Sequence, residues 1–360
     1  MNCSLKKVKL QSGTDIAASK SFYEGYDRSL DIRFYGPDNL YPQHIKNFFE
    51  TSPSLFAAVQ RKVDFLMGST GASELIDENT LKALLTDYSL FGGFALYVSY
   101  NGLGDIAYVS HVDFTTIRLG EQGSDGLFSY VYYSPDWSDQ ITVNRRRVKS
   151  KSDKVRYYLY SNNIDTRLRR MADNGTSGEI LYFSNTKGYP VEPCRPVLQF
   201  VSAECGIANE TYRSVRSSFV SSSVLSVPLQ SEQDLAQIAE DLEALQGDTD
   251  SFKILLMSHS TPEDKPEVLS LSAEDYTTRL TASAELCKNR ILEAYSQSNF
   301  GRLDSGGLGF STDIVAQVNE VYRWTLTRER NSIESFLKEV DPSFRLLPLP
   351  ELQTVTSART

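Results

Sequence analysis

The chain has 360 residues, 40% of them hydrophobic and 23% charged, so it is long enough to bury apolar cores without disulfide or metal staples. Its net charge of −9 argues against a protein that grips nucleic acid through phosphates, because such proteins usually carry a basic surplus. No stretch approaches ~18 apolar residues and the N-terminus lacks the apolar core of a signal peptide, so we expect neither a membrane span nor secretion.

The first 32 residues lack clear periodicity. Residues 1–32 look like an N-terminal arm. In the following RFYGPDNLYPQHIKNFFE, the Gly36-Pro37 and Tyr41-Pro42 pairs predict turns. The length of the chain predicts about two to three domains in all.

Two helices are predicted next. The first is capped by Ser52, begins at Pro53 and ends at Gly68, and the second spans residues 80–91 before Gly92-Gly93. Apolar side chains recur at helical spacing, namely Leu55, Phe56, Val59, Val63, Leu66 and Met67 in the first helix and Leu81, Leu84, Leu85, Tyr88 and Phe91 in the second.

Residues 94–184 are predicted to form a β-rich antiparallel module. Alternation of period two begins at Phe94, and Asn101-Gly102 is a strong hairpin signal. Further strands are expected at residues 106–110, 114–119, 127–134, 140–144, 154–160 and 179–184.

The C-terminal half is predicted to be mainly helical after the break at Pro190, Pro193 and Pro196. Helices are expected from near Ser202, at 231–246, at 273–296 and at 312–339, with strands at 224–228 and 252–257. The last helix would place Ile314, Val318, Val321, Tyr322, Ile333, Phe336 and Leu337 on one face and would reach roughly 40 Å. The Gly/Ser-rich segment 299–311 between the last two helices is predicted to be a loop.

No motif predicts an enzyme, a cofactor or a metal site. Gly301 and Gly306 have the spacing of a phosphate-binding loop, but Gly307 and Leu308 stand where Lys and Ser/Thr belong, and a helix rather than a strand precedes them. His111 is followed by Asp113, but no serine is marked as a partner for a triad. The cysteines and histidines are scattered, which favours reduced thiols over a metal cluster; they are Cys3, Cys194, Cys205, Cys287, His44, His111 and His259.

The densest basic stretch could contact DNA or an acidic partner, with a solvated hairpin rim as the alternative. It contains the predicted contact patch Arg145, Arg146, Arg147, Lys149 and Lys151, followed by Lys154, Arg156, Arg167, Arg169 and Arg170. Nearby tyrosines could stack on bases or pack a sheet.

The order of several segments resembles that of bacteriophage portal proteins, especially those of phages that infect Bacteroidetes. These segments are FYGPDNLYP, SPSLFAAVQRKVDFLMG, LFGGFALYVSYNGLGDIAYVSHVDFTTIRLG, YPVEPCRPVLQFVSAECGIANETYRSVRSSF, GDTDSFKILLM and SNFGRLDSGGLGFSTDIVAQVNEVYRWTLTRERNSIESFLKEV. The similarity runs from about residue 33 to 345. The chain departs from the family at GDTDSFK, which lacks the usual Asn-Ala-Gly before Lys253.

The resemblance implies an α+β portal fold with a β-rich wing module, stem helices, a small α/β clip and a long C-terminal helix. The implied parts are the arm at 1–32, a wing at 33–200, a stem and clip at 201–272, stem and wing helices at 273–345, and a short tail at 346–360, with little or no crown.

The same resemblance implies a structural role. Twelve or so copies would form a ring at the capsid vertex of the virion, assembled in the host cytoplasm, through which double-stranded DNA is packaged and ejected. Terminase, major capsid protein and a head-tail adaptor would be its partners. A tunnel loop facing the channel would include Arg302, Leu303, Asp304, Ser305, Gly306, Gly307 and Leu308. Two alternatives stay open: an enzyme acting on nucleotides or nucleic acid through the glycine-rich loop, and another capsid-associated scaffold or adaptor.

Overall fold

The computed structural model describes residues 26–27, 32–70, 73–123, 127–138, 142–143, 146–147, 154–174, 177–216, 224–228, 255–259, 273–304 and 312–347. The chain divides into two compact units, one made of residues 1–201 and 289–360 and the other of residues 202–288. Helices are combined with small, mostly antiparallel sheets, which confirms the predicted α+β class.

Three helices begin the first unit: α1 (Tyr41–Thr51), α2 (Pro53–Met67) and α3 (Glu78–Phe91). The predicted cap is confirmed, because the Ser52 side chain accepts a hydrogen bond from the Leu55 amide. Gly68 and Gly92 end α2 and α3 with φ angles of 62° and 82°, a conformation that glycine adopts without steric cost. Asp77 caps α3 by accepting a hydrogen bond from the Thr80 amide.

Two predictions in this region were wrong. Tyr41-Pro42 begins α1 instead of forming a turn, since proline is accepted in the first helical turn, where its missing amide would have no partner. Phe56, predicted on the buried stripe of α2, is 49% exposed, and its ring stacks on Phe49 with centroids 5.1 Å apart.

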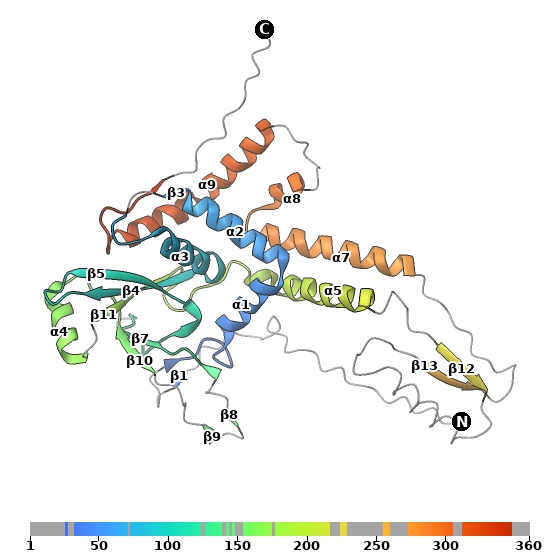
Figure 1. Ribbon diagram of the computed structural model, residues 1–360, viewed down its shortest axis with the longest axis horizontal. Helices are drawn as coiled ribbons and strands as arrows, with labels where there is room; N and C mark the ends of the chain where they lie inside the picture. Colours follow the sequence, from blue (N-terminus) through green and yellow to red (C-terminus); the bar gives the residue numbers. More distant parts are fainter. Residues whose placement is uncertain are drawn as a thin grey trace, which may run out of the picture. The chain divides into compact units, whose positions relative to one another are not determined.

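The main sheet lies against α3 (Figure 1). It has the order β11–β4–β5, with strands β4 (Gly93–Tyr100), β5 (Ile106–Val112) and β11 (Gly178–Ser184). The predicted hairpin joins β4 to β5. In its turn the Asn101 side chain accepts hydrogen bonds from the Leu103 and Asp105 amides, and Gly104, with φ of 87°, takes the left-handed position.

A second sheet has the order β10–β7–β6, with strands β6 (Ile117–Leu119), β7 (Tyr130–Tyr133) and β10 (Val155–Tyr158). The predicted strand at 114–119 therefore starts only at Ile117, after a 3₁₀ turn. Two short hairpins join β1 (Tyr26–Asp27) to β2 (Ile32–Arg33) and β8 (Thr142–Val143) to β9 (Arg146–Arg147). The buried Ile32 shows that the end of the predicted arm is tied to the fold.

Helix α4 (Ile164–Asn174) interrupts the module that was predicted to contain only strands. Its inward residues include Arg167, which is 5% exposed, and the half-buried Arg170 and Met171. Because cations occupy positions where apolar side chains usually mark a helix, periodicity alone could not identify it.

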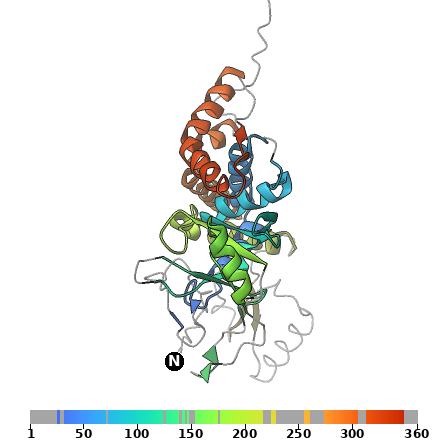
Figure 2. The same cartoon turned by 90° about the vertical axis from the view of Figure 1, so that its left-hand side faces the viewer.

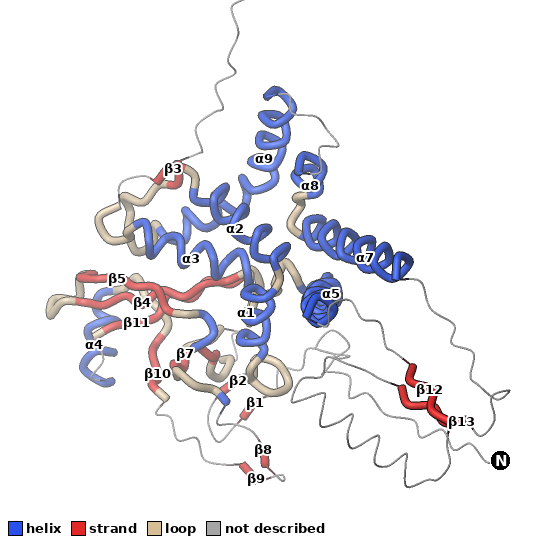
Figure 3. Tube along the Cα trace, turned by 45° about the vertical axis from the view of Figure 1, so that its right-hand side comes forward, coloured by secondary structure: helices blue, strands red, loops and turns tan. Residues whose placement is uncertain are grey.

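The C-terminal part of the first unit contains α8 (Ser298–Asp304), α9 (Thr312–Leu337) and β14 (Leu346–Leu347), which pairs with β3 (Ser69–Thr70). The prediction of a loop over residues 299–311 was wrong in its first part, because residues 299–304 belong to α8. Figures 2 and 3 show α9 beside α2, with α3 nearer the main sheet. Buried side chains of these helices and of β4 form one apolar cluster.

Helices α5 (Leu198–Arg216) and α7 (Ala273–Ala294) contribute residues to both units, and α5 begins four residues before its predicted start near Ser202. In the second unit β12 (Val224–Pro228) pairs in parallel with β13 (Leu255–His259). The first of these strands was predicted correctly, and the second overlaps the predicted 252–257 at residues 255–257 and continues to His259, with residues 252–254 outside the described residues. The helix predicted at 231–246 lies outside the described residues.

Candidate functional site

The opening segment, residues 33–40, is held by a buried arginine. Arg118 is 0% exposed and donates from Nε to Asn39 Oδ1 at 2.7 Å and from Nη1 to the carbonyls of Thr115 and Ile117. Burial lowers the pKa of Arg118 to about 10. Asn39 itself has φ of 62° and accepts a hydrogen bond from the Tyr35 amide. The asparagine of GPDNLYP is therefore a structural anchor.

Aromatic rings complete this anchor. Tyr35 stacks on Tyr189 with ring centroids 4.0 Å apart, and the Tyr189 hydroxyl donates to the Arg33 carbonyl at 2.6 Å. The same hydroxyl accepts a hydrogen bond from the Leu119 amide. The YP of YPVEPCRP is thus joined to the opening segment, so two of the resembling motifs form one structural unit.

Helix α9 is fixed to the unit by buried polar contacts. Lys62 on α2 is 6% exposed, and its Nζ lies 2.7 Å from Glu329 Oε2 on α9. Arg330 donates to the carbonyls of Phe65 and Leu66 at the end of α2 and to that of Leu347. The Phe65 and Leu66 carbonyls belong to the last turn of α2, where carbonyls lack a partner within the helix, so Arg330 satisfies them and orients α9.

A second set of buried contacts holds α9 in place, at the turn before α8. The Gln297 side chain is 0% exposed and donates to the Ala58 carbonyl at 2.8 Å and to the Tyr322 hydroxyl at 2.7 Å. Tyr322 packs edge-on against Phe65 and Phe300. The face of α9 that turns away from these contacts is therefore held in a defined orientation.

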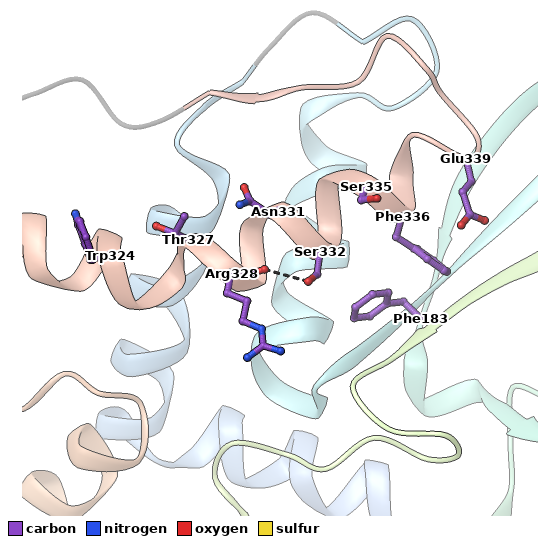
Figure 4. A pocket seen from close by; sticks show the side chains of 9 residues that line it. All are labelled: Phe183, Trp324, Thr327, Arg328, Asn331, Ser332, Ser335, Phe336 and Glu339. Carbon is purple, nitrogen blue, oxygen red and sulfur yellow. Dashed lines mark hydrogen bonds between the residues drawn. The ribbon is translucent and has the colours of Figure 1, made fainter.

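That outer face of α9 borders a groove of about 1000 Å³ (Figure 4). Trp324 lies at one end and the contacting rings of Phe183 and Phe336, 4.9 Å apart, lie at the other. Arg328 extends between them. The remaining lining residues are Thr327, Asn331, Ser332, Ser335 and Glu339.

Two apolar side chains on α9 are left in solvent. Trp324 is 79% exposed and Val321 is 56% exposed, although Val321 was predicted on the inward face. They are three residues apart and so share one side of the helix. We name this surface, Val321, Trp324 and the groove residues of α9, the outer α9 face. A large aromatic on a rigid, open groove is the kind of residue that anchors protein interfaces.

The predicted tunnel-loop residues are only partly described. Arg302, Leu303 and Asp304 belong to α8, and Leu303 packs against the apolar cluster. Ser305, Gly306, Gly307 and Leu308 lie outside the described residues. The placement of this segment in a channel stays a prediction.

The predicted basic patch is also described in part. Arg146 and Arg147 form β9, whereas Arg145, Lys149 and Lys151 lie outside the described residues. The nearby tyrosines do pack a sheet, since Tyr130 and Tyr158 are direct cross-strand neighbours. The Arg156 guanidinium lies over the Tyr130 ring and that of Arg170 over the Tyr158 ring, each at 4.6 Å; both belong to the basic stretch but not to the five-residue patch.

His111 is engaged in a pair that excludes a triad with Asp113. Its Nε2 lies 2.6 Å from Asp87 Oδ2, while Asp113 pairs with Lys46 at 2.7 Å. Ser110, the adjacent residue on β5, points to the opposite face of the strand. Burial raises the pKa of Asp87. Within the described ranges there is no group of three or more His, Cys, Asp or Glu side chains that could hold a metal ion.

No helix in the described part of the chain combines the length and apolarity that a membrane crossing requires. No family model matches the chain, and no curated protein matches it. Solved structures do show similarity. One is the neck of a native gene transfer agent particle computed with C12 symmetry, with TM-score 0.49, 11% identity and coverage of 85% of this chain and 84% of the other.

Two further structures are similar. A virion of the native gene transfer agent particle has TM-score 0.48, 12% identity and coverage of 87% and 84%. An HK97 family phage portal protein from Corynebacterium diphtheriae has TM-score 0.34, 10% identity and coverage of 69% and 75%. At TM-scores below 0.5 these similarities do not by themselves assign a family or a function.

Proposed function

We propose that the chain is a portal subunit, a structural protein whose copies form a ring at a capsid vertex for packaging and ejection of double-stranded DNA. The observation that carries this proposal is the outer α9 face, where Trp324 stands 79% exposed on a helix fixed by buried contacts. Such a surface fits a neighbouring subunit, because burying a large aromatic against a partner stabilises an interface by about 2 kcal/mol or more.

Three other features support the same role. The order of sequence segments resembles that of portal proteins over most of the chain. The net charge of −9 suits a conduit, because each neutralised phosphate adds affinity that moving DNA must then break. The buried cations Arg118 and Lys62 are committed to internal contacts, so they are withdrawn from DNA binding.

The glycine-rich segment is proposed as the tunnel loop, with its tip after α8. Since Leu303 packs against the apolar cluster, the part that can be removed without disturbing the fold begins beyond Asp304. We expect a deletion of residues 305–309 to leave folding and ring formation intact and to impair DNA packaging or retention. Normal DNA packaging by this variant would contradict the proposal that this segment is the tunnel loop. The same proposal includes contacts with terminase, capsid protein and a head-tail adaptor, a ring of about twelve copies, and an origin in a phage that infects Bacteroidetes.

The enzyme alternative has less support. Gly301 lies within α8 and a Cβ there would approach the Leu292 side chain to 2.9 Å, so this glycine serves helix packing. A phosphate-binding loop instead requires a glycine-rich turn between a strand and a helix.

Negative-stain electron microscopy of the purified chain over a concentration series tests the proposal. We expect rings with a central hole, alone or with capsid protein, and fewer rings for Trp324→Ala. Tyr108→Ala is the matched control, because Tyr108 is an exposed aromatic on β5, 61% accessible, and should assemble normally. Single particles at every concentration and with every partner would overturn the proposal.

A further inference from the structure

A second exposed apolar surface lies on the two helices that open the first unit. Phe49 of α1 and Phe56 of α2 stack with ring centroids 5.1 Å apart, and Phe56 is exposed. Ala57, the next residue of α2, is exposed as well. We name Phe49, Phe56 and Ala57 the aromatic patch. Each ring holds the other in place, so the patch offers a preformed apolar surface to a partner.

The aromatic patch faces away from α9. An α-helix turns by about 100° per residue, so Phe56 lies about 120° round α2 from Lys62, whose ammonium pairs with a glutamate of α9. On α9 the ring of Tyr322 packs against α2, and Trp324 lies about 160° round the helix from it. The outer α9 face and the aromatic patch therefore point in roughly opposite directions from the pair of helices α2 and α9.

Surfaces that point in opposite directions suit a head-to-tail contact between copies. When two different patches of identical subunits meet, the contact repeats from copy to copy and closes into a ring if the rotation allows it. In a ring of about twelve copies each subunit turns by about 30°, so its two contact surfaces point in directions about 150° apart. A single self-complementary patch would give a two-fold dimer instead.

The charges beside the two surfaces are complementary. Arg328 is exposed and extends along the groove of the outer α9 face (Figure 4). Glu50 follows Phe49 on α1, and Asp64 lies on the same side of α2 as Ala57; both carboxylates are exposed. No ion pair within the described part of the chain engages any of these three charged side chains. The guanidinium of one copy is thus available to a carboxylate of the next.

We propose that the outer α9 face of one copy binds the aromatic patch of a neighbouring copy, with Trp324 packed on the stacked rings and Arg328 beside Glu50 or Asp64. This inference rests on the proposed function, since it names the two surfaces that meet in the ring. Both surfaces are present in every copy and in equal number. Their directions and their charges therefore favour a second copy of this chain as the occupant of the groove.

Mixing two single variants tests the pairing directly. Trp324→Ala removes the anchor of the outer α9 face and keeps the aromatic patch, whereas Phe56→Ala does the reverse. Each variant alone should associate more weakly than the parent, by about 30-fold for Trp324→Ala and about tenfold for Phe56→Ala. In an equimolar mixture the intact groove of one variant should bind the intact patch of the other. The resulting pair should not extend, because both of its remaining surfaces are altered.

Native mass spectrometry identifies such pairs, because the two variants differ in mass. Mixed one-to-one pairs in excess over pairs of either variant alone support the inference. Rings of Phe56→Ala that form like those of the parent, or a mixture without preference for mixed pairs, overturn it. Tyr108→Ala, which truncates an exposed aromatic of β5, is the matched control and should form rings normally. A far-ultraviolet circular dichroism spectrum equal to that of the parent establishes that each variant is folded.

Charge reversal gives a second readout. Arg328→Glu should weaken association about fivefold at low salt and less at high salt, because exposed charges are screened beyond about 8 Å at physiological ionic strength. Reversing Glu50 and Asp64 to lysine in the same chain should recover most of the loss. Lys82→Glu, at an exposed position of α3, makes the same charge change elsewhere and should associate like the parent. A loss without recovery contradicts the pairing of Arg328 with these carboxylates.

The outcomes separate the inference from the proposed function. Parent rings that persist unchanged in Phe56→Ala contradict the inference alone and leave the ring function standing. A parent chain that forms no ring under any condition contradicts the proposed function itself.

Discussion

Replacing Arg118 by lysine should strongly destabilise the first unit, although the charge is kept. The guanidinium donates to Asn39 Oδ1 at 2.7 Å, to the Thr115 carbonyl at 2.9 Å and to the Ile117 carbonyl at 2.6 Å. It also reaches the Asn39 carbonyl and Gln43 Oε1. A lysine ammonium is a single point with three donors and cannot reproduce this planar fork.

The magnitude follows from the acceptors that would be left without a donor. A hydrogen bond to a charged group contributes about 1.5–3 kcal/mol, and at least two of these buried acceptors would lose theirs. We therefore expect Arg118→Lys to cost about 3–5 kcal/mol, the range for breaking a buried charged contact. Against a typical total of about 5–15 kcal/mol this is a large share. It corresponds to a shift of about 1–2 M in a urea midpoint.

Tryptophan fluorescence provides the assay. The chain has two tryptophans, and Trp324→Phe leaves only Trp137, which is 1% exposed and lies under the Arg118 guanidinium at 5.0 Å. In that background the red shift of Trp137 emission should occur at lower urea for Arg118→Lys. Arg169→Lys, at an exposed position of α4, is the control. A midpoint for Arg118→Lys within about 0.3 M of the parent would refute this account of the anchor.

Two further predictions concern Asp113, which precedes the 3₁₀ turn after β5, and Gly92, which ends α3. Burial tends to raise the pKa of Asp113, but hydrogen bonds from Lys46 and Thr115 outweigh it and hold the pKa below its usual value. This stability is present above the unfolded pKa near 3.9 and is lost as pH falls through the lower folded value. Asp113→Asn should therefore cost about 1 kcal/mol at pH 7 and almost nothing at pH 2–3, as measured by urea denaturation; an equal loss at both pH values would contradict the ion pair. Gly92→Ala should cost about 2–4 kcal/mol, because φ is 82° and a Cβ would lie 2.6 Å from the Val191 carbonyl oxygen. Gly102→Ala, which meets nothing within 4 Å, is its control, and equal thermal stability of the two variants would be evidence against the strain.

Local patterns predicted those elements whose apolar residues mark one face. Helix α3 and strand β4 follow this rule, and the caps at Ser52 and Gly92 depend only on neighbouring residues. Helix α1 was missed because Tyr41-Pro42 was interpreted as a turn, although Ile45 is buried at helical spacing from Tyr41. Helix α4 was missed because its most buried residue is a cation, Arg167. In α4 the buried Arg167 donates to the carbonyl of Gly104, a residue distant in the sequence, and to that of Ser161.

The sequence by itself determined the α+β class, the order of most elements and the net charge of −9, because periodicity, capping and charge are local properties. Only the tertiary structure decided that Asn39 and Tyr189 anchor the opening segment, that His111 pairs with Asp87, and that Trp324 is left in solvent. Each of these depends on which distant segments fold against one another. The exposure of a side chain is set by what covers it, and no spacing along the chain specifies that.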